Sequence, residues 1–305
     1  MSVKNKTSIK FFYMLTFSGE TRYKPSISIF FFLIYSVGVF VNSFIIIIIC
    51  LEVQLHKPMY LFICNLSLVD IFCISVPVPK LLHMLLSGNH IVSFSQCYTQ
   101  WYFFSAVVTA ETILLFIMAY DRYVAICIPL HYNQILNQRN CILITVGIWA
   151  VAFLNSLLLV VSALNMSSCL SNIIHQFFCD VKSLTRATCT TTPMFSEIVG
   201  IEIFIFAFIP FLSTCISYVN ILSVIFKMQS KESRKKAFST CSSHITIIII
   251  YYGAALIAYL IPSYSDVLDS VFNTIYTTMI PMINPIIYSL QNSNIQSALL
   301  RFVKR

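Results

Sequence analysis

The chain has 305 residues, of which 58% are apolar and only 10% are charged, with a formal net charge of +8. A soluble domain carries about a quarter charged residues, so this composition excludes a water-soluble enzyme or nucleic-acid-binding domain. The sequence has only 6 Gly and contains no GxxxxGK, GxGxxG or HExxH pattern, which removes the usual signatures of phosphate-binding loops and zinc proteases. We therefore expect a membrane protein that is not an enzyme and has no nucleic-acid partner.

Seven apolar stretches are each long enough to cross a bilayer. A helix rises ~1.5 Å per residue and the hydrocarbon layer is ~30 Å thick, so a span needs about 20 apolar residues. The predicted spans are Pro25–Leu51, Pro58–Pro79, Ile91–Tyr120, Asn140–Ala163, Ile198–Phe226, Ile245–Ser265 and Ser270–Leu300. We therefore predict an all-α membrane protein, a seven-transmembrane helix bundle over residues 25–290, with a tail at 1–24 and a short C-terminal surface helix and tail at 291–305.

The distribution of Lys and Arg predicts the orientation of the chain. An odd number of spans places the two termini on opposite sides of the membrane. Most of the 19 Lys and Arg residues lie on the side that includes the C-terminus, so the positive-inside rule places the C-terminus in the cytoplasm and the N-terminal tail outside. A glycosylation sequon at Asn5 suits an outside tail. The expected location is the plasma membrane, with several passes through it.

The 11 Cys residues fall into two groups according to their predicted position in the membrane. Four lie on the predicted outer side: Cys97, Cys169, Cys179 and Cys189. An even number in an oxidising compartment predicts two disulfides, and four Cys allow three pairings between which the sequence alone does not choose. The other Cys residues fall within spans or near their inner ends, where buried, reduced thiols are expected. His175 and Asp180 flank Cys179, but a disulfide at Cys179 leaves too few ligands for a closed metal site, so none is predicted there.

Four groups of motifs carry a resemblance to a known family. They are Leu55–Tyr60 with Asn65–Asp70, then Met118–Cys127, Lys236–His244 and Pro281–Ser289. In these motifs the chain resembles vertebrate odorant receptors, within the rhodopsin-like G-protein-coupled receptors, and the motifs follow the family's order. The chain departs from the family pattern at Val41 and Gln291, and the N-terminal tail matches poorly. The resemblance implies two disulfides: Cys97 with Cys179, and Cys169 with Cys189.

The resemblance implies a receptor that binds a small odorant outside and activates a cytoplasmic heterotrimeric G protein, of the stimulatory olfactory type that raises cyclic AMP. The chain from Cys97 to Arg122 corresponds to ~37 Å of helix, enough to cross the bilayer. At the inner end, Asp121 next to Arg122 predicts an ion pair that a partner protein replaces. The coupling and switch residues that the resemblance implies are Asp121, Arg122, Tyr123, Tyr218, His244, Asn284, Pro285 and Tyr288.

By the same resemblance, the ligand pocket lies in the outer half of the bundle, between spans three, five, six and seven. Such a lining is aromatic and aliphatic with a few hydroxyls, which suits a small, mostly apolar molecule fixed by one or two hydrogen bonds. The residues predicted to face the pocket are Phe104, Ser105, Val108, Thr109, Glu202, Phe206, Tyr252, Leu256, Tyr259, Thr274 and Thr277.

Glu202 is the unexpected member of this set, because a small or neutral residue is expected at that level of span five. One interpretation is a counter-ion for an amine ligand. The other is a residue near the lipid headgroups that reaches water or a neighbouring hydroxyl, and the cost of burying a charge favours this second interpretation.

Asp70 and Glu111 place two carboxyls near the middle of the membrane, with Asn42 and Asn284 at corresponding depths. A carboxylate in a low dielectric is retained when it binds a cation, finds donors or becomes protonated. We therefore hypothesise an ion or proton site, with sodium as the ion at Asp70 and Glu111, that biases the resting state. A neutral hydrogen-bonded cluster without an ion is an equal alternative. No other cofactor or metal is predicted.

Other function classes remain as alternatives. A transporter or channel usually has two related halves with broken helices, and the chain has no internal repeat. Another rhodopsin-like receptor, such as one that senses amines through Glu202, is the nearer alternative. Span seven contains no lysine for a retinal Schiff base, and the Lys236–His244 motif favours an odorant receptor. The expected partners are a small odorant, a heterotrimeric G protein and the lipid bilayer.

Overall fold

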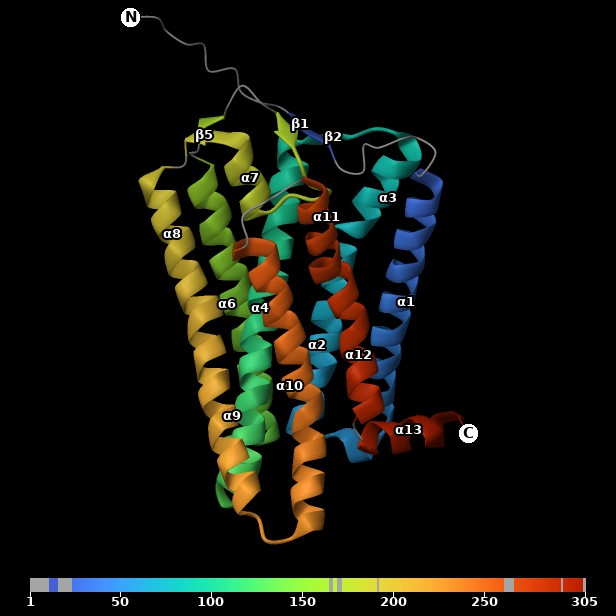
Figure 1. Cartoon of the computed structure of the whole chain (residues 1–305), viewed down its shortest axis with the longest axis vertical. Helices are drawn as coiled ribbons and strands as arrows, with labels where there is room; N and C mark the ends of the chain where they lie inside the picture. Colours follow the sequence, from blue (N-terminus) through green and yellow to red (C-terminus); the bar gives the residue numbers. More distant parts are fainter. Residues whose placement is uncertain are drawn as a thin grey trace, which may run out of the picture.

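The computed structural model describes residues 11–15, 24–164, 167–168, 172–190, 192–260, 266–291 and 293–303. The long helices run side by side as a bundle, with short strands at one end and α13 (Ser293–Val303) across the other (Figure 1). We call these ends the sheet end and the α13 end. The position of α13 confirms the predicted short C-terminal surface helix.

Within the described residues, the bundle consists of seven helical spans, as the sequence predicts. Six of them are long and apolar enough to cross a membrane by length and composition. The seventh is formed by α11 and α12. The helices of the spans, in order, are α1 (Lys24–Leu51), α2 (Pro58–Ser75) with α3 (Val78–Ser87), α4 (Phe94–Cys127), α6 (Gln138–Ala163), α8 (Pro193–Ile203) with α9 (Ile209–Lys227), α10 (Lys231–Leu260), and α11 (Asp266–Thr274) with α12 (Ile280–Gln291).

Several helices extend beyond the predicted membrane segments. Span six was predicted to begin at Ile245, whereas α10 begins at Lys231 and carries the basic residues before the span as helix. The backbone hydrogen bonds of a helix can continue from the membrane into water. The charged residues that mark the end of a membrane segment therefore do not end the helix. Short helical turns connect the spans at the α13 end: Val53–Leu55, Pro129–His131 and α5 (Tyr132–Ile135).

Three spans depart from a regular α-helix. Span two breaks between α2 and α3 at Pro77, because proline has no backbone N–H to continue the ladder. Span five contains a π-helical turn at Phe204–Phe208, followed by Pro210 in α9. Span seven contains a second π-helical turn at Ile275–Met279. Such turns insert an extra residue into the helix and change which side chains face the bundle interior.

A three-stranded sheet covers the sheet end. In it, β1 (Phe11–Met14) pairs antiparallel with β2 (Ile91–Ser93) and parallel with β4 (Ile173–Ile174). A separate antiparallel pair joins β3 (Ser167–Ser168) to β5 (Thr188–Thr190), and α7 (Val181–Ala187) lies between β4 and β5 in the chain. The all-helical prediction did not include these strands, because strands of 2 to 4 residues show too little alternation to detect.

A disulfide fixes the loop after α6 to the first turn of α4. It joins Cys97 to Cys179, with 5.4 Å between their Cα atoms, and confirms that predicted pairing. The Oε1 atom of Gln100 accepts a hydrogen bond of 2.9 Å from the backbone N–H of Cys179. The second predicted pair falls on Cys169 and on the side chain of Cys189, outside the part of the chain that the structure describes, as does the sequon at Asn5.

His90 makes the sheet end sensitive to pH. Its side chain is only 8% exposed, and its ring centroid lies 5.9 Å from that of Tyr13. Burial, and secondarily the charge of Lys24, lower the pKa of His90 below its ordinary value of 6.5, although a hydrogen bond with the Met14 backbone opposes the shift. The folded state therefore binds fewer protons than the unfolded state around that pH. Its contribution to stability is present above pH ~6.5 and is lost as the pH falls below it.

We therefore expect the sheet of β1, β2 and β4 to loosen when the pH is lowered from about 7.5 to about 5. Hydrogen exchange of the Phe11–Met14 amides in nanodiscs measures this loosening. The variant His90→Gln serves as the control and should lose most of the pH dependence. Protection that is independent of pH in the unmodified chain would contradict the prediction.

Candidate functional site

A cavity of about 310 Å³ lies toward the sheet end, between α4, α8, the π-helical turn of span five and α10. Most of its wall is aromatic or aliphatic. Eight residues predicted to face the ligand form part of this wall: Phe104, Ser105, Val108, Thr109, Glu202, Phe206, Tyr252 and Leu256. The other lining residues are Trp101, Thr112, Leu159, Asp180, Val181, Val199, Ile203, Ala207, Phe208, Phe211, Tyr251, Ala255 and Tyr276.

Thr274 and Thr277 do not line the cavity, and their predicted position is corrected here. Both are buried, and their hydroxyls donate to carbonyls one turn back in their own span, at 2.7 Å to Ser270 O and 2.7 Å to Asn273 O. The prediction came from the family resemblance, whereas the residue of the π-helical turn of span seven that lines the cavity is Tyr276. The side chain of Tyr259 lies outside the described part of the chain.

Some of the missed lining residues had a sequence signal. Trp101 and Thr112 lie on the stripe of α4 that contains Phe104 and Val108, at helical spacing. Asp180 had only its position beside Cys179 as a signal, and it reaches the cavity because the disulfide draws the loop over it.

A polar contact joins three helices at the cavity wall. The side-chain amide of Asn155 in α6 donates to Thr109 Oγ1 in α4 at 3.2 Å, and it also hydrogen-bonds the Glu202 carboxyl in α8. Thr109 in turn donates to Ser105 O at 2.9 Å. Among the described residues, the polar partner of Glu202 is therefore the side-chain amide of Asn155.

A cluster of hydroxyls closes the inner part of the cavity. Thr112 Oγ1 and Tyr251 OH lie 2.8 Å apart, and Tyr276 OH donates to Tyr251 OH at 3.4 Å. These contacts connect α4, α10 and the π-helical turn of span seven. The neighbouring hydroxyl of Tyr252 is buried in the cavity wall and has no hydrogen-bond partner among the described residues.

Deeper in the bundle, Asn284 Nδ2 donates to Asp70 Oδ1 at 2.9 Å. Glu111 lies close enough to Asp70 for their charges to repel, and both side chains are at most 2% exposed. Asp70 Oδ2 and Glu111 Oε1 have no hydrogen-bond partner in the described part of the chain. The structure thus brings three of the four predicted ion-site residues together.

Asn42, the fourth residue of the predicted ion site, connects two helices. Its amide donates to Gly38 O at 3.0 Å and to Pro281 O at 2.9 Å, which fastens α1 to α12. A Cβ atom on Gly38 would lie 2.8 Å from the Ile74 side chain, so α1 and α2 approach closely at the same level. Among the described residues, Asn42 makes no hydrogen bond to either carboxyl and its Oδ1 atom has no partner, so its place in the ion site stays a prediction.

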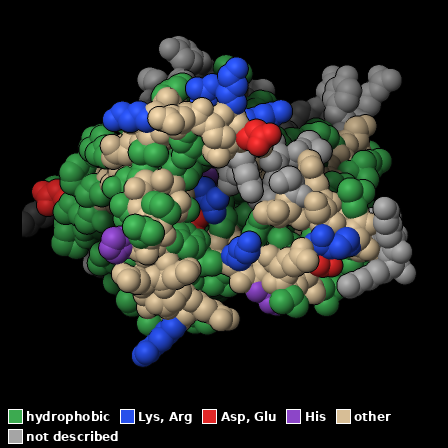
Figure 2. All heavy atoms as spheres, turned by 90° about the horizontal axis from the view of Figure 1, so that it is seen from below, with side chains coloured by type: hydrophobic (Ala, Val, Ile, Leu, Met, Phe, Trp, Pro, Cys, Tyr) green, Lys and Arg blue, Asp and Glu red, His purple; other side chains and the backbone are tan. Residues whose placement is uncertain are grey.

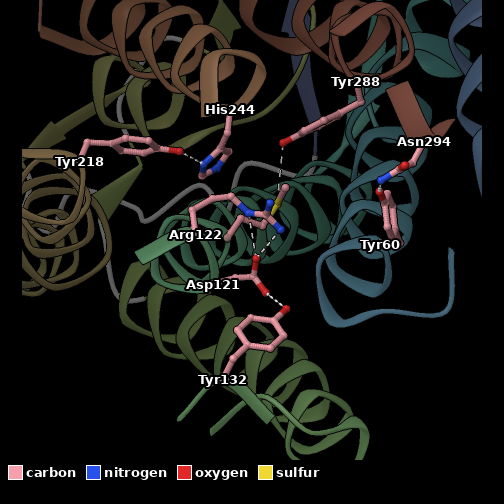
Figure 3. A network of polar contacts seen from close by, with 9 residues as sticks. Tyr60, Asp121, Arg122, Tyr132, Tyr218, His244, Tyr288 and Asn294 are labelled. Carbon is pink, nitrogen blue, oxygen red and sulfur yellow. Dashed lines mark hydrogen bonds and ion pairs between the residues drawn. The ribbon is translucent and has the colours of Figure 1, made fainter. Parts of the chain in front are cut away.

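At the α13 end, Arg122 is held by its neighbour Asp121 (Figure 3). The Nη2 and Nε atoms of Arg122 donate to Asp121 Oδ2 at 2.6 and 2.9 Å, and Tyr132 OH donates to Asp121 Oδ1 at 2.8 Å. Burial, then the charge of Asp121 and this hydrogen bond, raise the pKa of Tyr132 above its ordinary value of 10. The hydroxyl therefore remains a donor, and Asp121 is fixed from both sides.

The other predicted switch residues lie around this pair. Tyr218 OH and His244 Nδ1 are 2.6 Å apart and join α9 to α10, while Tyr288 OH points to Met118 Sδ at 3.9 Å (Figure 3). Tyr123 stacks on Tyr120 at 6.4 Å between centroids. Asn284 belongs to the deeper carboxyl cluster, and Pro285 lies inside α12. Tyr132 was not predicted, because it lies in the short helix α5 after α4, where helical spacing does not relate it to Asp121.

Comparison with known proteins identifies the family. A sequence model described as olfactory receptor matches residues 31–305. The chain belongs to the olfactory receptor family. Olfactory receptor 8H3 of Homo sapiens is 39% identical, over 100% of this chain and 98% of its own. Olfactory receptor 5B21 of Mus musculus is 37% identical, over 100% and 96%, and olfactory receptor 1G1 of Gorilla gorilla gorilla is 40% identical, over 99% and 97%. The family consists of multi-pass receptors of the plasma membrane.

The hydroxyl cluster gives a test of the receptor's stability. Removing the Tyr251 hydroxyl leaves those of Thr112 and Tyr276 without this partner, so Tyr251→Phe should lower the free energy of unfolding by ~1 kcal/mol. Thermal unfolding of the purified receptor in detergent measures the change. The adjacent variant Tyr252→Phe removes a hydroxyl that has no partner among the described residues, and it should leave stability unchanged or slightly higher. Equal losses in both variants would contradict the assignment.

Proposed function

We propose that the receptor binds a small, mostly apolar odorant in the cavity and activates a stimulatory heterotrimeric G protein, which raises cyclic AMP. The observation that supports this most directly is the course of α4. One end of this single helix forms the cavity wall from Trp101 to Thr112, and the other end carries the Asp121–Arg122 pair. A ligand at one end therefore acts on the same rigid element that presents the guanidinium at the other.

The proposed orientation places the sheet end outside and the α13 end in the cytoplasm. The Cys97–Cys179 disulfide supports an oxidising compartment at the sheet end. The face at the α13 end carries more Lys and Arg than Asp and Glu (Figure 2), as the positive-inside rule requires of a cytoplasmic side. In this orientation the N-terminus, with its sequon at Asn5, is extracellular and the C-terminus is cytoplasmic.

In the proposed resting state, Asp121 holds Arg122 and Tyr132 holds Asp121. The contact between Tyr218 and His244 keeps α9 and α10 together at the same end. A ligand that binds a second arrangement more tightly shifts the population toward it, and only differential affinity drives that shift. The released guanidinium and the space beside α10 then become the surface that the G protein binds.

The buried carboxyls fit a small cation or a proton. Asp70 Oδ2 and Glu111 Oε1 are unpartnered among the described residues, and two nearby carboxylates repel unless a positive charge lies between them. Asp70, Glu111 and Asn284 would hold a sodium ion, which would neutralise this repulsion and favour the resting arrangement. No other cofactor is proposed.

A cyclic-AMP reporter in cells that display the receptor at the surface tests the proposal. A chemically broad odorant panel should contain activators, and Arg122→Ala should abolish their response. Ala255 lines the cavity while its neighbour Ala254 does not. Ala255→Phe should fill part of the cavity and raise the half-maximal concentrations at least about fivefold, whereas Ala254→Phe at equal surface expression should not. Responses that survive Arg122→Ala would exclude this coupling.

The contact from Tyr132 to Asp121 predicts a change in basal signalling. Tyr132→Phe removes one hydrogen bond of ~1 kcal/mol from the resting state, so the active population should rise about fivefold. Ligand-free cyclic AMP, normalised to surface expression, measures it. Tyr120→Phe removes a hydroxyl on α4 and serves as the control. Basal signalling that stays level in both variants would show that Tyr132 does not stabilise the resting state.

A further inference from the structure

Glu202 gives the cavity a carboxyl group that no basic residue of the cavity wall balances. The lining contains no Lys or Arg, and in the described part of the chain no basic side chain pairs with Glu202. The second carboxyl in the wall, Asp180, accepts from the backbone N–H of Ser183 at 2.7 Å and caps α7. The nearby ammonium of Lys182 donates to Ala258 O, at the sheet end of α10.

The position of the Glu202 side chain is fixed by the protein. Its hydrogen bond with Asn155, which is itself held by Thr109 Oγ1 at 3.2 Å, orients the carboxyl between α4, α6 and α8. A carboxylate accepts several hydrogen bonds, and one amide donor leaves most of this capacity for a ligand. In a cavity of low dielectric, a charge-assisted bond to that carboxylate is stronger than one in water.

A second polar group in the wall of the same cavity, the hydroxyl of Tyr252, has no hydrogen-bond partner among the described residues. The Tyr252 side chain is 8% exposed, lines the cavity from α10, and its hydroxyl makes no hydrogen bond within the described residues. Leaving a buried hydroxyl without a partner costs free energy. A ligand with a second polar group could satisfy it, while the rings of Phe104 and Phe206 in the same wall offer apolar contact.

We propose that the ligands of this receptor include small organic amines, whose ammonium group pairs with the Glu202 carboxylate while the hydrocarbon part lies against the aromatic wall. This inference rests on the proposed function and specifies the ligand class of the same cavity. The ammonium of the bound amine balances the negative charge of the Glu202 carboxylate in this apolar space. The N–H groups of the amine donate to the positions on the carboxylate that Asn155 leaves open.

The test compares ligands that share a carbon skeleton and differ in one polar group. The probes are 2-phenylethylamine and 2-phenylethanol, with hexylamine and hexan-1-ol as an aliphatic pair. Receptor variants are Glu202→Gln, which keeps the shape and removes the charge, and Glu202→Asp, which keeps the charge. Glu197→Gln is the matched control, because Glu197 is exposed on the same helix and is not part of the cavity wall.

We expect the amines to activate at lower concentrations than their alcohols. Glu202→Gln should raise the half-maximal concentrations of the amines at least about tenfold and change those of the alcohols less than about threefold. Glu202→Asp should retain part of the amine response, and Glu197→Gln all of it. Amines that are inactive while alcohols activate, or amines that act equally on Glu202→Gln, would overturn the inference and leave the proposed function standing.

A binding measurement separates the two proposals. Thermal stabilisation of the purified receptor by 2-phenylethylamine, lost in Glu202→Gln, needs no G protein. Stabilisation without cyclic AMP would support the amine site and count against the proposed coupling. If the amine neither stabilises the receptor nor activates it, the inference is wrong.

Discussion

A polar group inside the bundle has to find its partner within the protein, because hydrocarbon offers none. Most buried hydroxyls of the receptor meet this constraint locally, as Thr277 does with a carbonyl of its own span. The Nδ2 atom of Asn42 meets it between helices and thereby fastens α1 to α12. Among the buried groups of the described residues that do not meet it, Asp70, Glu111 and Tyr252 each keep an unpartnered oxygen beside a proposed site.

The same constraint explains what the sequence could predict. The lengths of the apolar stretches and the few charges that interrupt them predict the spans, the surface helix and the Asp121–Arg122 pair. The Cys97–Cys179 pairing came from the family motifs, and the structure confirms it. The residues of α4 that were expected at the pocket from the family resemblance do line the cavity, and they recur at regular helical spacing because that helix is unbroken.

In span seven, the family resemblance indicated two side chains that do not line the cavity, Thr274 and Thr277. The π-helical turn Ile275–Met279 contains no proline or glycine, so its sequence gives no signal of the irregularity. Of its residues, Tyr276 lines the cavity and Thr277 does not. The pairing of the strands at the sheet end joins segments that are distant in sequence, and the contact of Tyr132 with Asp121 depends on the turn of the chain between α4 and α5. No local pattern in the sequence predicts these contacts, so they are found only in the folded structure.

The small size of the cavity limits the ligands in a second way. A space of about 310 Å³ is at the lower end of ligand pockets in proteins and admits only molecules of low mass. Low mass and a mostly apolar surface are also what gives a compound an appreciable vapour pressure. In the proposed function, the size and the apolar wall of the cavity therefore favour molecules that are volatile enough to travel through air.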